Sequence, residues 1–151
     1  MVSARFMGVR IPPSAHLSSV MTIDEIYLSE AVKEAQIGLE KKEEPVGAVV
    51  VIARRVLGRA HHQTQALRDP TAHAVMIALT QAAGTSKNGK LKGAQVYATQ
   101  TPCRMCLAAA ELAGIRRIVH GSVRKHQTAA KIKLVGPVLL KTYRTKKKLG
   151  C

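Results

Sequence analysis

Two short segments of this chain each combine a proline-marked helix start with side chains that bind metals. They read Asp69-Pro-Thr-Ala-His73 and Thr101-Pro-Cys-Arg-Met-Cys106. Asp or Thr followed by Pro is typical of a helix cap and the first helical residue. The sequence therefore predicts helices over about residues 70–83 and 102–113, with the histidine and the two cysteines in their first turns.

His73, Cys103 and Cys106 form the donor set of a zinc site. The positive end of a helix favours a thiolate, which is the form of cysteine that binds metal. One imidazole and two thiolates suit tetrahedral zinc, and three protein ligands leave a fourth coordination position open. The alternative is a pair of buried structural cysteines beside a core histidine. The helix context and the Cys-x-x-Cys spacing favour the metal, so we predict one Zn²⁺ bound by these three residues.

The rest of the chain alternates helical and strand-like patterns, which indicates an α/β fold. Thr22 and Glu25 have the spacing of a capping box and predict a helix over about residues 23–41. The expected apolar stripe of this helix consists of Leu28, Ala31, Val32, Ala35 and Leu39. Strands are expected at 46–52, 56–60, 95–99, 117–120 and 132–135, and a short basic helix at 139–148. The first two strands form a hairpin whose turn, Ala53-Arg54-Arg55, has poor turn chemistry.

Positive charge is concentrated in the second half of the chain. Residues 1–70 contain nine Lys or Arg against eight Asp or Glu, whereas residues 71–151 contain fifteen against one. This imbalance favours a polyanionic partner, and we predict RNA; a solvated lysine surface is the alternative. Aromatic residues make up only 3%, so base stacking is not the main source of affinity. The expected phosphate-contacting residues are Arg116, Arg117, Arg124, Lys125, Lys131, Lys133, Lys146, Lys147 and Lys148.

The first twenty residues differ in composition from the rest, with two arginines, four serines, Pro12-Pro13 and no acid. We predict that residues 1–20 are a disordered extension or follow from a misassigned start, with Met21 as the other start, and that 21–151 are a single zinc domain. Targeting to an organelle by residues 1–20 is the alternative. No apolar run is long enough to cross a bilayer, and three cysteines make no disulfide framework. We therefore expect a cytoplasmic protein that does not bind membranes.

Three motifs, in this order, resemble the zinc-dependent cytidine-deaminase-like superfamily: Val46-Gly-Ala, Asp69-Pro-Thr-Ala-His73 and Pro102-Cys-Arg-Met-Cys106. Within it they look most like the tRNA adenosine deaminases, which convert adenosine to inosine. The resemblance implies a three-layer α/β/α fold with a five-stranded mixed sheet, Zn²⁺ as cofactor, and a dimer that binds the anticodon arm of tRNA. It also implies that the positions of Val46, His62 and Ala72 contact the substrate.

The chain departs from this family around the expected pocket. The family signature has a glutamate two residues after the ligand histidine, which moves protons without touching zinc. Here this catalytic position holds Val75, whose side chain has no titratable proton. His62 replaces the asparagine that holds the substrate, and Gln100-Thr101 replaces Leu-Glu. The segment between Gly121 and Ile132 is also shorter than the family has.

Other residues could carry the proton in place of Val75. Glu111 follows Cys106 by five residues on one helix, and this spacing turns it away from the metal. His61 and His62 are the other candidates, although an imidazole cannot simply replace a carboxylate that belongs on another helix. Catalysis is therefore expected to be weak or absent.

The tetrapeptide His73-Ala-Val-Met resembles the non-catalytic subunit of the eukaryotic heterodimeric tRNA adenosine deaminase, which also has valine at this place. The favoured hypothesis is a zinc-binding, RNA-binding protein of the tRNA adenosine deaminase type, catalytically impaired alone. It would act as a homodimer or as a heterodimer with an active homologue. The alternative is an active zinc-dependent nucleobase, nucleoside or tRNA deaminase that uses an unrecognised proton shuttle. A decaying gene copy without a function is the third hypothesis.

Overall fold

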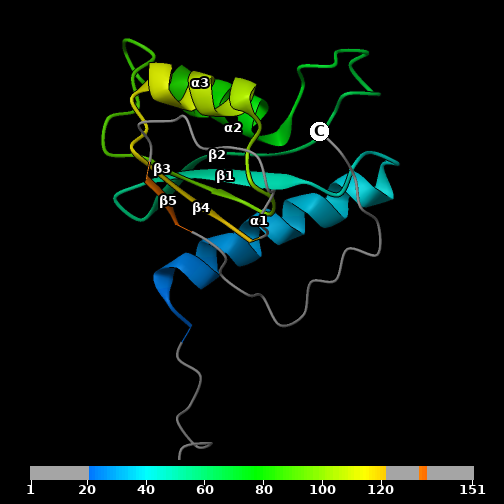
Figure 1. The fold of residues 1–151 in the computed structure, drawn as a ribbon, viewed down its shortest axis with the longest axis horizontal. Helices are drawn as coiled ribbons and strands as arrows, with labels where there is room; N and C mark the ends of the chain where they lie inside the picture. The colour runs from blue at the N-terminus through cyan, green and yellow to red at the C-terminus, as the bar shows by residue number, and fades with distance from the viewer. Residues whose placement is uncertain (1–20, 122–132, 136–151) are drawn as a thin grey trace, which may run out of the picture.

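The computed structural model describes residues 21–121 and the strand at 133–135. Residues 1–20 and the basic helix expected at 139–148 lie outside the described residues. Figure 1 shows a mixed sheet with helix α1 (Ile23–Glu40) on one side and helices α2 (Ala74–Gly84) and α3 (Arg104–Ala113) on the other. The predicted α/β class, with a mixed sheet flanked by helices, is confirmed.

The sheet has the strand order β2-β1-β3-β4-β5. The strands are β1 (Gly47–Ile52), β2 (Arg55–His61), β3 (Gln95–Ala98), β4 (Arg117–His120) and the short β5 (Lys133–Val135). Strand β1 is antiparallel to both β2 and β3, whereas β3, β4 and β5 run parallel. All five strands lie within one residue of their predicted ends, because each is a short run that contains Val or Ile, which favours a strand over a helix.

Helix α1 begins as predicted, with a full capping box between Thr22 and Glu25. Its buried face differs from the predicted stripe at the C-terminal end. Leu39 is 62% exposed, and the face is completed instead by Glu34 and Gly38. The absence of a side chain at Gly38 lets this turn of the helix lie against His61, since a Cβ added there would be 3.1 Å from the His61 Cβ.

The hairpin between β1 and β2 forms despite its turn sequence. Ala53 and Arg54 both have positive φ, 45° and 64°, which is the left-handed conformation that the tight hairpin turn requires. The Tyr27 hydroxyl donates a hydrogen bond of 2.9 Å to the carbonyl of Arg54. This contact from α1 and the pairing of the flanking strands override the weak local preference.

Helices α2 and α3 begin later than predicted, so both expectations of a helix starting at proline were wrong. The Asp69 carboxylate accepts from the amide and the hydroxyl of Thr71, at 2.8 and 2.7 Å, which makes a local turn in place of a helix cap. The N-cap residues are His73 for α2 and Cys103 for α3, and neither side chain makes a capping hydrogen bond. The metal-binding side chains therefore stand at the helix starts themselves.

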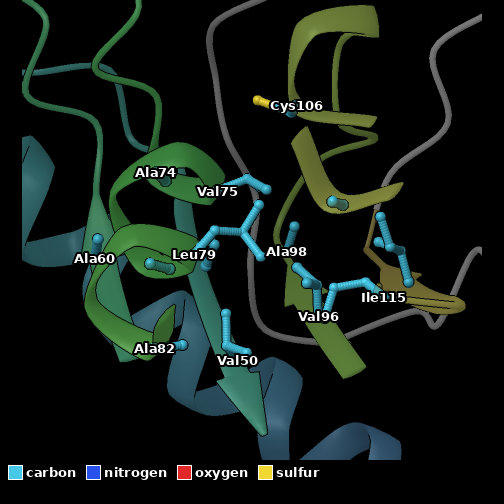
Figure 2. Close-up of a cluster of buried hydrophobic side chains, with 14 of the residues drawn as sticks. Val50, Ala60, Ala74, Val75, Leu79, Ala82, Val96, Ala98, Cys106 and Ile115 are labelled. Carbon is cyan, nitrogen blue, oxygen red and sulfur yellow. The ribbon is translucent and has the colours of Figure 1, made fainter. Parts of the chain in front are cut away.

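The larger core lies between the sheet and the pair α2 and α3 (Figure 2). Gly58 of β2 lets α2 approach the sheet, since a Cβ there would be 2.2 Å from the Ala78 carbonyl oxygen. Val75 and Cys106 point into the space between the two helices, at the end of this core. The candidate site is therefore continuous with the close-packed apolar core.

Candidate metal centre

His73, Cys103 and Cys106 bring three ligand atoms together, as the sequence predicted. His73 Nδ1 lies 3.5 Å from Cys103 Sγ and 3.6 Å from Cys106 Sγ, and the two sulfurs are 3.6 Å apart. Nδ1 is therefore the ring nitrogen that faces both sulfurs. The sulfurs are too far apart for a disulfide, and none joins the two cysteines.

This triangle fits zinc. Around a tetrahedral ion with Zn–S of about 2.3 Å and Zn–N of about 2.0 Å, two sulfurs lie about 3.8 Å apart and a sulfur and a nitrogen about 3.5 Å apart. The three separations in the chain match this pattern to within a few tenths of an ångström. The chain thus contains a zinc-binding region with a His-Cys-Cys ligand cluster. These three residues would hold a zinc ion, and a site with three protein ligands would let the ion supply Lewis-acid chemistry as well as structural support.

The ligands stand where the chain passes from a strand into a helix. His73 follows β2 and begins α2, and Cys103 follows β3 and begins α3. Strand β3 ends at Ala98, and the next residue pairs with the start of β1, where the Thr99 amide donates to the Gly47 carbonyl at 3.0 Å. The Thr99 hydroxyl in turn accepts from the Gly47 amide at 3.1 Å. This reciprocal pair fixes the segment that carries the first cysteine. The starts of two helices then meet beside the carboxyl end of β3.

A small cavity adjoins the triangle, with a volume of about 20 Å³, which is room for roughly one water molecule. It is lined by Val46, His62, Val75, Gln100, Thr101 and Pro102 together with the three ligand residues. Among these described lining residues there is no Asp or Glu. Of the residues predicted to contact substrate, Val46 and His62 line the cavity. Ala72 does not, and its carbonyl accepts from the Gln63 amide at 3.1 Å.

Val75 is buried, with 4% of its surface exposed, and belongs both to the cavity wall and to the apolar core. Its position on the first turn of α2 points it toward α3 (Figure 2). The position that the sequence predicted for the family's proton shuttle therefore lines the cavity. At this position the chain has only the two methyl groups of Val75.

The two neighbouring histidines at the end of β2 face opposite layers. His61 lies against α1, where its Nδ1 is 3.7 Å from a Glu34 carboxylate oxygen. His62 lies on the cavity side, where its Nδ1 accepts a hydrogen bond of 3.1 Å from the Ala74 amide. His61 is therefore turned away from the metal centre, which removes one of the two histidines proposed from the sequence as a proton carrier.

Thr101 and His120 form a second polar pair next to the cavity. The Thr101 hydroxyl is 3.3 Å from His120 Nδ1, and both side chains are buried. His120 was not predicted as a site residue. A sequence signal did exist, since His120 is the last residue of a strand parallel to β3, and the carboxyl ends of parallel strands meet at one edge of the sheet.

Glu43 and Glu44 were also not predicted as site residues. The Glu43 carboxylate accepts from the amides of Gln65 and Ala66, at 3.2 and 2.7 Å, and so holds the turn that leads toward His73. Glu44 places a carboxylate oxygen 3.7 Å from His62 Nε2. Nothing in the sequence pattern links these acids to the site, because they approach it from the end of α1.

The predicted phosphate contacts lie only partly within the described residues. Arg124, Lys125, Lys131 and Lys146 to Lys148 fall outside them, and Lys133 is described only as part of β5. Arg116 is exposed and Arg117 begins β4. Because β3 and β4 are parallel, these two arginines stand at the amino ends of the strands, whereas the metal centre lies beyond the carboxyl end of β3.

Arg117 is engaged with other protein groups. Its guanidinium binds Asp24 through two contacts, of 3.0 and 2.6 Å, and also donates to Gln95. Hydrogen bonding to Arg117 holds the pKa of the Asp24 carboxyl below its usual value, and the same bond raises the pKa of Arg117. The neighbouring Tyr97 hydroxyl has its pKa raised to about 12, by burial first and by the Asp24 charge second. This cluster joins α1 to the sheet.

Within residues 21–121 and 133–135, no helix is both long and apolar enough to cross a membrane.

The chain matches the family model of the cytidine and deoxycytidylate deaminase zinc-binding region over residues 21–122. It is 39% identical over 102 residues to a tRNA-specific adenosine deaminase of Bacillus subtilis, covering 68% of this chain and 63% of the relative. It is 37% identical over 101 residues to a tRNA-specific adenosine deaminase of Aquifex aeolicus, covering 67% of each. The chain thus spans about two thirds of the length of these relatives.

A solved structure from a study of A-to-I editing by tRNA:A34 deaminases superposes with a TM-score of 0.61 at 38% identity. The superposition covers 64% of this chain and 70% of the other. The family match over residues 21–122 includes His73, Cys103 and Cys106.

Proposed function

The chain belongs to the cytidine and deoxycytidylate deaminase zinc-binding family, and from this premise we propose that it is a zinc-binding, RNA-binding protein of the tRNA adenosine deaminase type with impaired catalysis. The tRNA branch is supported by the two bacterial relatives and by the solved tRNA:A34 deaminase structure. The zinc site is supported by the ligand triangle of His73, Cys103 and Cys106. In this family the ion supplies a hydroxide nucleophile at neutral pH, because zinc lowers the pKa of water.

The observation that carries the impairment is Val75 in the cavity wall. Hydrolytic deamination needs a group that takes a proton from the nucleophile and gives one to the leaving amine, and the family uses a glutamate for both transfers. General acid–base catalysis contributes about 10²–10⁴-fold to rate. None of the described residues that line the cavity has a carboxylate to supply it. Loss of this contribution leaves a site that holds zinc and turns over slowly.

His62 is a poor replacement for the missing glutamate. One of its ring nitrogens accepts from the Ala74 amide and the other faces the Glu44 carboxylate. A proton carrier must present a nitrogen to the reacting atoms within about 3 Å. Both nitrogens of His62 are directed at protein groups, which supports slow turnover.

RNA, most directly tRNA, is the proposed partner. The proposal rests on the basic second half of the chain and on the names of its relatives. A chain that binds tRNA but catalyses poorly is best suited to act beside an active homologue, as a heterodimer, with a homodimer as the other assembly. Its part would be RNA-binding surface and a zinc-stabilised fold.

The test is zinc content together with adenosine-to-inosine conversion on tRNA, with and without an active homologue such as the Bacillus subtilis enzyme. We expect one zinc per chain, little conversion by the chain alone, and a rate with the homologue that depends on the amount of this chain added. Conversion by the chain alone at the rate of the homologue would contradict the impaired function.

One observation favours a second candidate, an active zinc-dependent deaminase with a different proton shuttle. Thr101 lines the cavity and its hydroxyl contacts the buried His120, which is an arrangement of hydroxyl and imidazole suited to proton transfer. If this pair moves the proton, Thr101→Val and His120→Gln would each lower the rate of the wild-type chain by about 10²-fold or more. If conversion by the wild type is already negligible, the second candidate is ruled out.

A further inference from the structure

The first amide of helix α2 donates its hydrogen bond to a residue outside the helix. His73 is the N-cap but makes no capping bond with its own side chain, which instead faces the two sulfurs. The amide of Ala74, the first helical residue, donates to His62 Nδ1 at 3.1 Å. The first amides of a helix have no partner within the helix, so a buried helix start needs such an acceptor. His62 therefore supplies the cap that His73 gives up in order to face the metal position.

This hydrogen bond also fixes the state of the His62 ring. A nitrogen that accepts from an amide carries no proton, so a neutral His62 carries its proton on Nε2. Nε2 points toward the Glu44 carboxylate, with 3.7 Å between Nε2 and the nearer oxygen. The ring is thus held by the start of α2 on one side, and the end of α1 lies close to its other nitrogen. Its plane has little freedom to turn.

The fixed ring lies against His73. The two imidazoles stack with their centroids 4.7 Å apart and their planes inclined by 21°. A stacked neighbour restricts rotation of the His73 ring about its Cβ–Cγ bond, and that rotation decides whether Nδ1 faces the two sulfurs. Groups that orient a ligand histidine typically affect metal affinity by 10–100-fold.

We propose that His62 is a positioning residue for zinc: it caps α2 at Ala74 and stacks on His73, so that Nδ1 of the ligand histidine is oriented before the ion binds. This inference rests on the zinc site of the proposed function. It also revises the role expected for His62 from the family resemblance, because a ring with both nitrogens directed at protein groups is not arranged to hold a substrate. The substrate contact of the family has been exchanged for support of the metal ligand.

His61 provides a matched control. It is the preceding residue, is an imidazole buried to the same degree, and also lies near a glutamate, but it faces α1 on the opposite side of the sheet. Replacing His61 removes the same chemical group from the same strand end without touching the start of α2. Differences between His61 and His62 variants therefore report on position, and not on the loss of a buried histidine as such.

The experiment compares the wild-type chain with His62→Ala, His62→Asn, His62→Phe and His61→Ala. Asparagine retains an acceptor for the Ala74 amide but no ring, whereas phenylalanine retains a ring to stack on His73 but no acceptor. Two quantities are measured on each folded protein: the Zn²⁺ dissociation constant, by competition with a chromophoric chelator, and the absorption spectrum with Co²⁺ in place of Zn²⁺. The cobalt spectrum reports ligand geometry, which a loss of overall stability does not alter.

We expect His62→Ala to raise the Zn²⁺ dissociation constant by about 10–100-fold and to shift the ligand-field bands of cobalt. His62→Asn and His62→Phe should each recover part of that loss, and His61→Ala should stay within about twofold of the wild type. If His62→Ala does not fold, the asparagine and phenylalanine variants carry the test, and both must weaken Zn²⁺ binding.

Wild-type affinity and an unchanged cobalt spectrum in the His62 variants would overturn the positioning role, even if their melting temperatures fall. Equal losses in His61→Ala and His62→Ala would overturn it as well, because the effect would then be one of packing. A wild-type chain that binds no Zn²⁺ would instead contradict the zinc site, and with it the function on which the inference rests.

Discussion

The sulfur atoms of Cys103 and Cys106 lie 3.6 Å apart, each about the same distance from Nδ1 of His73. The start of α3 sets the distance between the two sulfurs, because Cys103 is the N-cap of this helix and Cys106 lies in its first turn. The separation is close to that of two sulfurs bound to one tetrahedral zinc ion. The fold therefore arranges the three donors for metal through α2 and α3.

We expect Cys103→Ser to lower both the zinc content and the melting temperature. The three ligands join the starts of two helices, so an ion that binds only the folded chain stabilises it, by about 2.7 kcal/mol when free zinc is at 100 times its dissociation constant. The measurements are metal analysis of the purified protein and thermal unfolding with and without a chelator. A folded wild-type chain that contains no metal and is indifferent to the chelator would contradict this expectation.

The ligands were predictable from the sequence because a metal site needs particular residue types at close spacing, and Cys-x-x-Cys places both sulfurs on one helix turn. The strands were predictable because their runs contain Val or Ile and are too short for helices. The helix starts were not, since Asp69 uses its carboxylate for a turn with Thr71. The contacts of His62 with Ala74 and Glu44 were not predictable either, because they join segments that no periodic pattern relates.

Arg116 and Arg117 are expected to differ in function although they are neighbours. Arg117→Ala should reduce the free energy of unfolding by about 1–2 kcal/mol, because it leaves Asp24 without its paired guanidinium. Arg116→Ala, at an exposed position, should change stability by less than about 0.5 kcal/mol. Chemical denaturation measures both.

RNA binding by the same two variants separates stability from contact with phosphate. If Arg116 belongs to the phosphate-contacting surface, its alanine variant binds tRNA more weakly at low salt, while a folded Arg117→Ala protein binds about as well as the wild type. Equal weakening by both variants would show that the Asp24 pair opens to let Arg117 reach the RNA.

The lysines at 146 to 148 should add to the salt dependence of RNA binding. Each phosphate neutralised by a protein cation releases counterions, which contributes about −0.7 to −0.9 to the slope of log affinity against log salt. Replacing the three lysines with glutamine should make that slope less negative, with little change in the melting temperature. If RNA binding by the wild type does not depend on salt, the basic half of the chain is a solvated surface and not a phosphate-contacting one.

Asp24→Asn is expected to lower the pKa of Tyr97 from about 12 without returning it to 10. Burial is the first cause of the raised pKa and remains in the variant, whereas the negative charge of Asp24, the second cause, is removed. A folded-state pKa above the unfolded value means that the contribution of Tyr97 to stability is complete below about pH 10 and is lost as the pH rises toward 12. Ultraviolet titration of tyrosine ionisation, with Tyr97→Phe to identify the signal, measures the shift. An unchanged titration in Asp24→Asn would show that the carboxylate has no effect on Tyr97.

Val75→Glu is expected to raise deamination of tRNA adenosine above the wild-type rate. The side chain at this position reaches the cavity from the first turn of α2, so the variant places a carboxylate beside the ligand triangle. Full recovery of general acid–base catalysis would raise the deamination rate by up to about 10²–10⁴-fold. We expect only part of this gain, because His62 and not asparagine occupies the substrate position. The variant should be less stable in the absence of zinc, since Val75 is buried among apolar side chains and an unpaired carboxyl there costs about 1–3 kcal/mol.

Val75→Gln is the matched control for this gain. Glutamine has nearly the shape of glutamate but carries no titratable proton, so it should give no more conversion than the wild type. The gain in Val75→Glu should also disappear when Cys103→Ser is added, because the carboxylate acts only beside a loaded zinc site. Equal activity of the glutamine and glutamate variants would mean that size or polarity at position 75, and not proton transfer, limits the reaction. A wild-type chain as fast as Val75→Glu would show that another residue, with Thr101 and His120 the first to examine, already moves the proton.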